Sequence, residues 1–123
     1  MKKYIREEII FGMSDLNPRK TGLNVIIWTD HSSVNRFVSH KNTPRVKIGK
    51  NFQEFVTVSI AENPKILGKS KGLKKSDMNS IYEGIDYVKR NADLFLKHYN
   101  DTDGSYDDED LYSDLRRRGE YRW

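Results

Sequence analysis

Cysteine is absent from this chain of 123 residues, which excludes disulfide bonds and thiolate metal sites. Long hydrophobic runs are absent as well, since no apolar stretch approaches the ~18–20 residues that cross a bilayer. The N-terminus, MKKYIREEIIFG, starts with basic side chains, but Glu7 and Glu8 stand where a signal peptide has its apolar region. We therefore expect a cytoplasmic protein with no export signal and no contact with a membrane.

Motifs that fix a reaction are also missing. No Gly-x-Ser-x-Gly stretch is present, and Ser32 and Ser33 are neighbours of His31 only in sequence, which says nothing about the geometry of a catalytic triad. The segment GKSKG, residues 68–72, lacks the upstream glycine and the strand–loop–helix order of a phosphate-binding loop. It is more typical of a flexible connector.

The histidine content does not favour a metal site. Asp30 and His31 supply at most two ligands, whereas a site needs three or four at fixed geometry, so we expect no metal and no cofactor. One enzymatic hypothesis remains, a metal-independent ribonuclease, which needs a general acid, a general base and a cation for the phosphorane. The side chains of suitable type are His31, His40, Arg36, Arg45 and Lys47.

Charge is distributed unevenly along the chain. The formal charge is +8 over residues 1–100, −7 over residues 101–114 and +3 over residues 115–123, which sums to +4. A basic body of this kind indicates an anionic partner. The acidic segment has three readings: a mimic of nucleic acid, a lid over the basic surface, or a linker and helix start where acids are favoured.

Four segments have the composition of β-strands. LNVIIW is apolar on both faces, as expected for a central strand, whereas PRVKIGK and FVTVSIAE alternate between apolar and polar residues. The predicted strands cover residues 23–28, 44–50, 55–62 and 64–68. In the second of them, Arg45 and Lys47 are predicted to point away from the core. Residues 4–13 are ambiguous between a strand and a helix.

Two segments have helical periodicity. Apolar residues recur at steps of three and four over residues 78–99, which predicts one long amphipathic helix with Ser76 as its N-cap. After a linker over residues 101–106, the run DDEDLYSDLRRRG predicts a short helix with acids in its first turn and arginines in its last. Leu111 and Leu115 lie on one side of that helix.

These elements predict an α+β fold. We expect a small, mostly antiparallel sheet of three to four strands, with the long amphipathic helix packed on one face. Residues 1–100 would form a single α+β domain, and residues 101–123 an acidic linker with a short C-terminal helix. The helix could dock on another copy of the chain through its leucines, which would make the protein a homo-oligomer or a self-assembling structural protein.

The other sheet face and the nearby loops are predicted to form a basic binding surface. Trp28, Phe37 and Phe52 are candidate stacking surfaces for bases, although Trp28 and Phe52 also suit a core. The loop over residues 68–75 adds Lys69, Lys71, Lys74 and Lys75 to the surface if the loops converge. The predicted binding residues are Arg36, His40, Arg45, Lys47, Lys50, Lys69 and Lys71.

The segments FGMSDLNPRKTGLNVIIW, PRVKI and VTVSIAENPKILG resemble a group of small bacterial and phage proteins with no established activity. The resemblance covers roughly residues 11–99. The group's Arg-His pair is not matched, because residues 36–40 read RFVSH and Arg36 is displaced. The matching residues are Thr21, Gly22, Leu23, Trp28, His40, Arg45 and Lys47.

This resemblance implies a phage or mobile-element context, in which small non-enzymatic proteins often block a host or defence machine. The sequence therefore favours a non-enzymatic binding protein whose basic surface engages an anionic partner. That partner is a nucleic acid, a nucleotide signal, or an acidic patch on a protein that the chain inhibits. The ribonuclease and the self-assembling protein are the alternatives.

Overall fold

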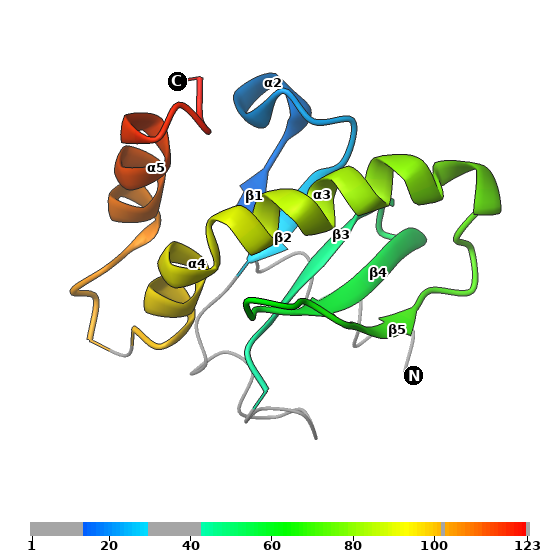
Figure 1. The fold of residues 1–123 in the computed structure, drawn as a ribbon, viewed down its shortest axis with the longest axis horizontal. Helices are drawn as coiled ribbons and strands as arrows, with labels where there is room; N and C mark the ends of the chain where they lie inside the picture. Colours follow the sequence, from blue (N-terminus) through cyan, green and yellow to red (C-terminus); the bar gives the residue numbers. More distant parts are fainter. Residues whose placement is uncertain (1–13, 30–42, 102, 123) are drawn as a thin grey trace.

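A computed structural model describes residues 14–29, 43–101 and 103–122. These residues form an α+β fold in which helices cover one face of an antiparallel sheet (Figure 1). The predicted fold class is therefore confirmed. The sheet has five strands, whereas three to four were expected.

The strands follow one another across the sheet in chain order, and each pairs with the next in antiparallel fashion. Such an order is expected when the connections are short, because antiparallel neighbours need only a tight turn between them. The strands are β1 (Ser14–Leu16), β2 (Ile26–Thr29), β3 (Arg45–Asn51), β4 (Glu54–Ser59) and β5 (Ile66–Lys69).

The strand that the sequence did not predict is β1. It has only three residues, too few to show a periodic pattern, and the turn residues Asn17 and Pro18 follow at once. Those residues begin a one-turn helix, α2 (Pro18–Thr21), in which the Asn17 side chain accepts from the backbone N–H of Lys20. Gly22, at φ +82°, ends the turn.

The predicted long helix is interrupted at Asn91. It consists of α3 (Met78–Arg90) and α4 (Ala92–Tyr99), and Asn91 between them has φ −119° and ψ 25°. The buried Asn91 side chain donates to the carbonyl of Tyr87, in competition with regular helical bonding. Ser76 is not the N-cap, because it lies inside a 3₁₀ turn, η2 (Lys75–Asp77), that precedes α3.

Helix α3 crosses the sheet in direct contact with it at Gly84 (Figure 1). A Cβ atom at this position would lie 2.6 Å from Cγ2 of Ile48 in β3 and 2.9 Å from Cγ2 of Val25. Both side chains are buried and β-branched, so they have little freedom to move aside. The distance between helix and sheet is therefore set by the absence of a side chain at residue 84.

Helix α5 (Asp108–Arg117) is joined to the same core. A capping box formed by Asp107 and Asp110 starts it, which confirms the prediction that acids occupy its first turn. Leu111 and Leu115 are fully buried among the core residues of the sheet and of α3. These two leucines, predicted as a surface for self-association, are therefore used inside the chain.

A buried histidine links α4 and α5 to the edge strand β1. His98 has no exposed side-chain surface; its Nε2 atom lies 2.7 Å from Oδ1 of Asp108, and its Nδ1 atom lies 3.4 Å from Oγ1 of Thr29. Asp108 also accepts a hydrogen bond from the hydroxyl of Ser14, the residue opposite Thr29 in the sheet. This network joins four elements and leaves the imidazole inaccessible to a substrate.

We expect Gly84→Val to lower the free energy of unfolding by about 2 kcal/mol, because its side chain would overpack the contact with Ile48 and Val25. Urea unfolding measures the change. Asn79→Val is the control on the exposed side of the same helix, and asparagine and valine have similar helix propensities, so it should change stability by less than about 0.5 kcal/mol. Equal effects of the two substitutions would contradict the close approach at residue 84.

Candidate functional site

The predicted binding residues fall into separate places in the structure. Arg36 and His40 lie outside the described residues, as does His31, so the histidines of the ribonuclease hypothesis stay a prediction. The remaining members are Arg45, Lys47, Lys50, Lys69 and Lys71. They are distributed over two ends and both faces of the sheet.

Arg45 was predicted on an exposed outer face, but its side chain is buried and only 6% of the residue is exposed. Nε donates to the carbonyl of Thr43 over 2.8 Å, and Nη2 is the one buried side-chain nitrogen or oxygen in the described residues that has no hydrogen-bond partner. Burial lowers the pKa of Arg45. A guanidinium group enclosed in this way is poorly placed for contact with a large partner.

Lys47 is on the sheet face that α3 does not cover, where it packs on aromatic side chains. Its Nζ atom lies 5.2 Å from the centre of the Phe55 ring and donates to Oγ1 of Thr57 over 3.0 Å. Trp28 and Phe55 are buried on this face, and Phe52 packs against them. Trp28 is therefore a packing residue, in agreement with the second of its two predicted roles.

The other three lysines lie at the opposite end of the sheet from Arg45. Lys50 lies five positions after Arg45 in β3, which is about 17 Å at ~3.4 Å per residue. Lys69 is opposite Val56 near the start of β4, and this places Lys69 and Lys71 at the Lys50 end. The single patch predicted from the sequence is thus divided between two ends of the sheet.

Two loops converge at the Lys50 end, and Ser70 joins them. The Ser70 hydroxyl donates to the carbonyl of Gln53 over 2.6 Å and accepts from the backbone N–H of Phe55 over 3.0 Å. The backbone N–H of Ser70 donates to the carbonyl of Phe55 over 2.9 Å. One hydrogen bond therefore holds the segment after β5 against the turn between β3 and β4, and two hold it against Phe55 at the start of β4.

Gly72 adds a second point of contact between the same loops. A Cβ atom here would lie 2.4 Å from the carbonyl oxygen of Gln53, so the loop packs against the turn through backbone alone. The sequence predicted that Lys74 and Lys75 would join the basic surface if the loops converged. The contacts of Ser70 and Gly72 hold the segment over residues 69–75 against the turn that follows Lys50, whereas the loop over residues 30–42 lies outside the described residues.

We call this surface the lysine end: Lys50, Lys69, Lys71, Lys74 and Lys75. Lys50 is half-buried and donates to the carbonyl of Asn24 over 2.8 Å, whereas the other four are exposed. With the nearby carboxylates of Glu54 and Asp77, the formal charge of this end is +3.

Glu54 remains ionised between these lysines. The Asn51 amide, which donates to its carboxylate, is the main cause that lowers the pKa of Glu54. The charges of Lys74 and Lys50 lower it further. The lysine end is therefore an arrangement of cations around a fixed carboxylate.

A shallow groove on the outer side of α3 is a second candidate site. Its volume is about 450 Å³, and it is lined by Leu23, Asn79, Tyr82, Glu83, Asp86 and Arg90. Arg90 donates to Asp86 and to Glu120, which follows α5. Its guanidinium group is held by this pairing, which serves to join α3 to the C-terminal segment.

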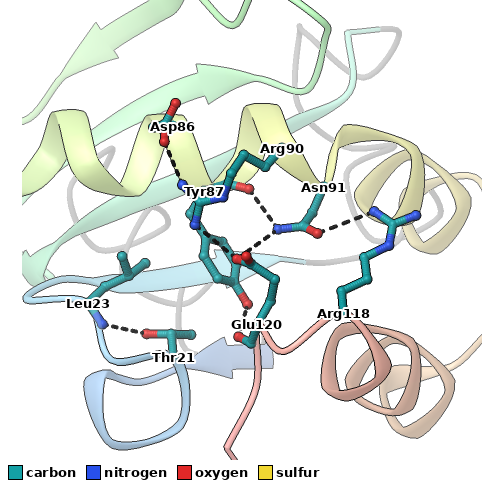
Figure 2. Close-up of polar contacts among 8 residues, drawn as sticks. All are labelled: Thr21, Leu23, Asp86, Tyr87, Arg90, Asn91, Arg118 and Glu120. Atoms are coloured by element: carbon teal, nitrogen blue, oxygen red, sulfur yellow. Dashed lines mark hydrogen bonds and ion pairs between the residues drawn. The ribbon is translucent and has the colours of Figure 1, made fainter.

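Figure 2 shows how this junction continues beside the groove. The Tyr87 hydroxyl donates to the carbonyl of Glu120 over 2.7 Å, and burial raises the pKa of Tyr87, which keeps it a neutral donor. Asn91 donates to the Glu120 carboxylate and accepts from Arg118 (Figure 2). These groups bond one another across α3 and the C-terminal segment, as expected for a structural clamp.

Arg118 links the end of α5 to α4. It bonds Asp93 of α4, instead of Asp114 one turn before it, and this contact is the main cause that lowers the pKa of Asp93. Asp114 pairs with Arg117 and accepts from Tyr106. Contacts that begin or hold α5 thus engage four acids of the acidic segment over residues 101–114: Asp107, Asp108, Asp110 and Asp114.

Comparisons of the chain with protein-family models, with curated proteins and with solved structures found no match. Within residues 14–29, 43–101 and 103–122, no helix has both the length and the apolar character needed to cross a membrane. The same residues contain no group of three or more His, Cys, Asp or Glu side chains able to hold a metal ion.

We expect Ser70→Ala to destabilise the protein by about 1–2 kcal/mol, because it leaves the N–H of Phe55 and the carbonyl of Gln53 without their hydroxyl partner. Urea unfolding measures the loss, and hydrogen exchange should be faster at the Phe55 amide. Ser76→Ala, at an exposed position in η2, is the control and should change stability by less than about 0.5 kcal/mol. A Ser70→Ala variant as stable as this control would show that the hydroxyl does not join the loops.

Proposed function

We propose that this chain is a small, non-enzymatic binding protein that engages an anionic partner through the lysine end. The observation that carries the proposal is the joining of two loops by Ser70, since it gathers lysines from separate sequence segments on one surface. This surface keeps Lys50, Lys69 and Lys71 from the sequence prediction and adds Lys74 and Lys75. Buried Arg45 is not part of it.

Two physical features favour the binding of an anion here. Four of the lysines are exposed, so their charges reach a partner without the cost of removing them from a buried environment. The backbone that carries them is held by hydrogen bonds, so less conformational entropy is lost on association than with a free loop. Clustered cations also accelerate encounter with an anionic partner.

The partner belongs to one of three classes: a nucleic acid, a nucleotide signal, or an acidic surface of a protein. In the third class, the partner is a host defence protein, and this chain is a phage or mobile-element protein that inhibits it. Binding to these three classes of partner differs in its dependence on the salt concentration and on the shape of the partner. All three require the lysines, which makes removal of their charges the first test.

We expect Lys71→Gln/Lys74→Gln to bind a polyanion about tenfold or more weakly at low salt, because two cations of the surface are lost. Retention on heparin and fluorescence anisotropy with a single-stranded oligonucleotide provide the measurement. The slope of log affinity against log salt should fall by about two.

Lys89→Gln/Lys97→Gln is the matched control, since it removes the same charge from exposed positions on α3 and α4. This variant should keep the affinity and most of the salt dependence of the wild type. If both pairs weaken binding equally, the interaction follows net charge and the proposal for the lysine end is wrong.

A further inference from the structure

The two edges of the sheet differ in their contacts with the other described elements. Beside β1, the hydroxyl of Ser14 donates to Asp108 of α5, and the backbone N–H of Arg122 donates to the carbonyl of Lys20 over 2.7 Å. Strand β5 is the opposite edge, and Figure 1 shows it far from α5. Within the described residues, no strand pairs with its outer side. In this part of the chain its outward backbone donors and acceptors are therefore not paired in the sheet, and an added strand would bond them.

An apolar side chain is exposed in the middle of this edge. Leu67 is 47% exposed, and in the described part of the chain only Tyr82 is another large hydrophobic residue that is exposed. The register between β4 and β5 shifts at this point, from Thr57 opposite Gly68 to Val58 opposite Ile66. Gly68 has nothing within 4 Å of the position a Cβ would take, so the space over the sheet face is open at this residue of the edge strand.

Lysines stand on both sides of this exposed leucine. Lys65 precedes β5, Lys69 ends it, and Lys71 follows in the loop that Ser70 fixes. Lysines and an irregular register are also devices by which proteins protect an edge from unwanted pairing. Protection accounts for the lysines, but it does not account for Leu67, because an exposed large hydrophobic side chain makes an edge more prone to association.

We propose that β5 accepts an extended acidic segment of a partner protein as a sixth strand. The added strand would bond the free edge through its backbone, cover Leu67 with an apolar side chain, and place carboxylates near Lys65, Lys69 and Lys71. This inference rests on the proposed function and assigns the anionic partner to the protein class. A nucleic acid has no backbone amides that could extend the sheet.

The test uses a ten-residue peptide of alternating glutamate and valine as the probe. A peptide of alternating glutamate and proline is its control, with the same charge but half of the backbone N–H groups removed and a polyproline conformation favoured. We expect the valine peptide to bind at least about tenfold more tightly. We also expect it to slow hydrogen exchange at the amides of residues 66–69.

Leu67→Ser should weaken binding of the valine peptide about tenfold, because it removes the apolar contact and leaves every lysine in place. Tyr82→Ser, which removes the exposed aromatic side chain of α3, should leave the affinity unchanged. A ten-nucleotide single strand is tested beside the peptides. The lysine variants described above are tested with the same three probes.

Equal binding of the two peptides, or binding without protection of residues 66–69, overturns strand addition. If Lys71→Gln/Lys74→Gln still weakens binding of these probes, the proposed function stands. Binding of the oligonucleotide alone also overturns strand addition and assigns the lysine end to nucleic acid. Failure of all three probes, with no effect of the lysine variants on heparin, overturns both the inference and the proposed function.

Discussion

The close contact between Gly84 and the sheet is the constraint on which the rest of the structure depends. Because residue 84 has no side chain, α3 lies directly on Ile48 and Val25. The segment from Ser70 to η2 connects β5 to this helix, and Ser70 and Gly72 contact Gln53 in the turn between β3 and β4. The lysines of that segment thus lie between the edge strand and the helix that packs on the sheet.

The same packing separates acidic from basic residues. Helix α5 lies at the β1 edge, where Asp108 bonds His98 and Asp107 forms the capping box with Asp110 (Figure 1). Strand β5 and the lysine end are on the other side of the sheet. In the described residues, the acidic segment therefore stabilises a helix and its connection, and it does not neutralise the lysine end. Three interpretations of the acidic segment were drawn from the sequence. This arrangement agrees with the one in which its acids belong to a linker and a helix start.

Elements with a strong pattern were predictable from the sequence, and short or strained ones were not. The alternation in β3 and β4 and the helical periodicity of α3 and α5 predicted an α+β fold. The break at Asn91 was missed because it depends on a buried side chain that bonds Tyr87, and periodicity does not report such a bond. Arg45 was placed on an exposed face because strand alternation gives the side of the sheet, whereas burial depends on tertiary packing. Ser70 was assigned to a connector, because the sequence does not show that its hydroxyl bonds Gln53 in a distant turn.

The proposed function requires that lysines from two sequence segments form one surface for an anion. The most direct measurement is a map of backbone amide chemical shifts during titration with a short heparin fragment. We expect the largest changes to fall together on residues 50–54 and 69–75, at the same heparin concentration, because Ser70 joins the two loops. Changes centred on the arginines that end α5, or on only one of the two loops, would show that the lysines do not form one surface.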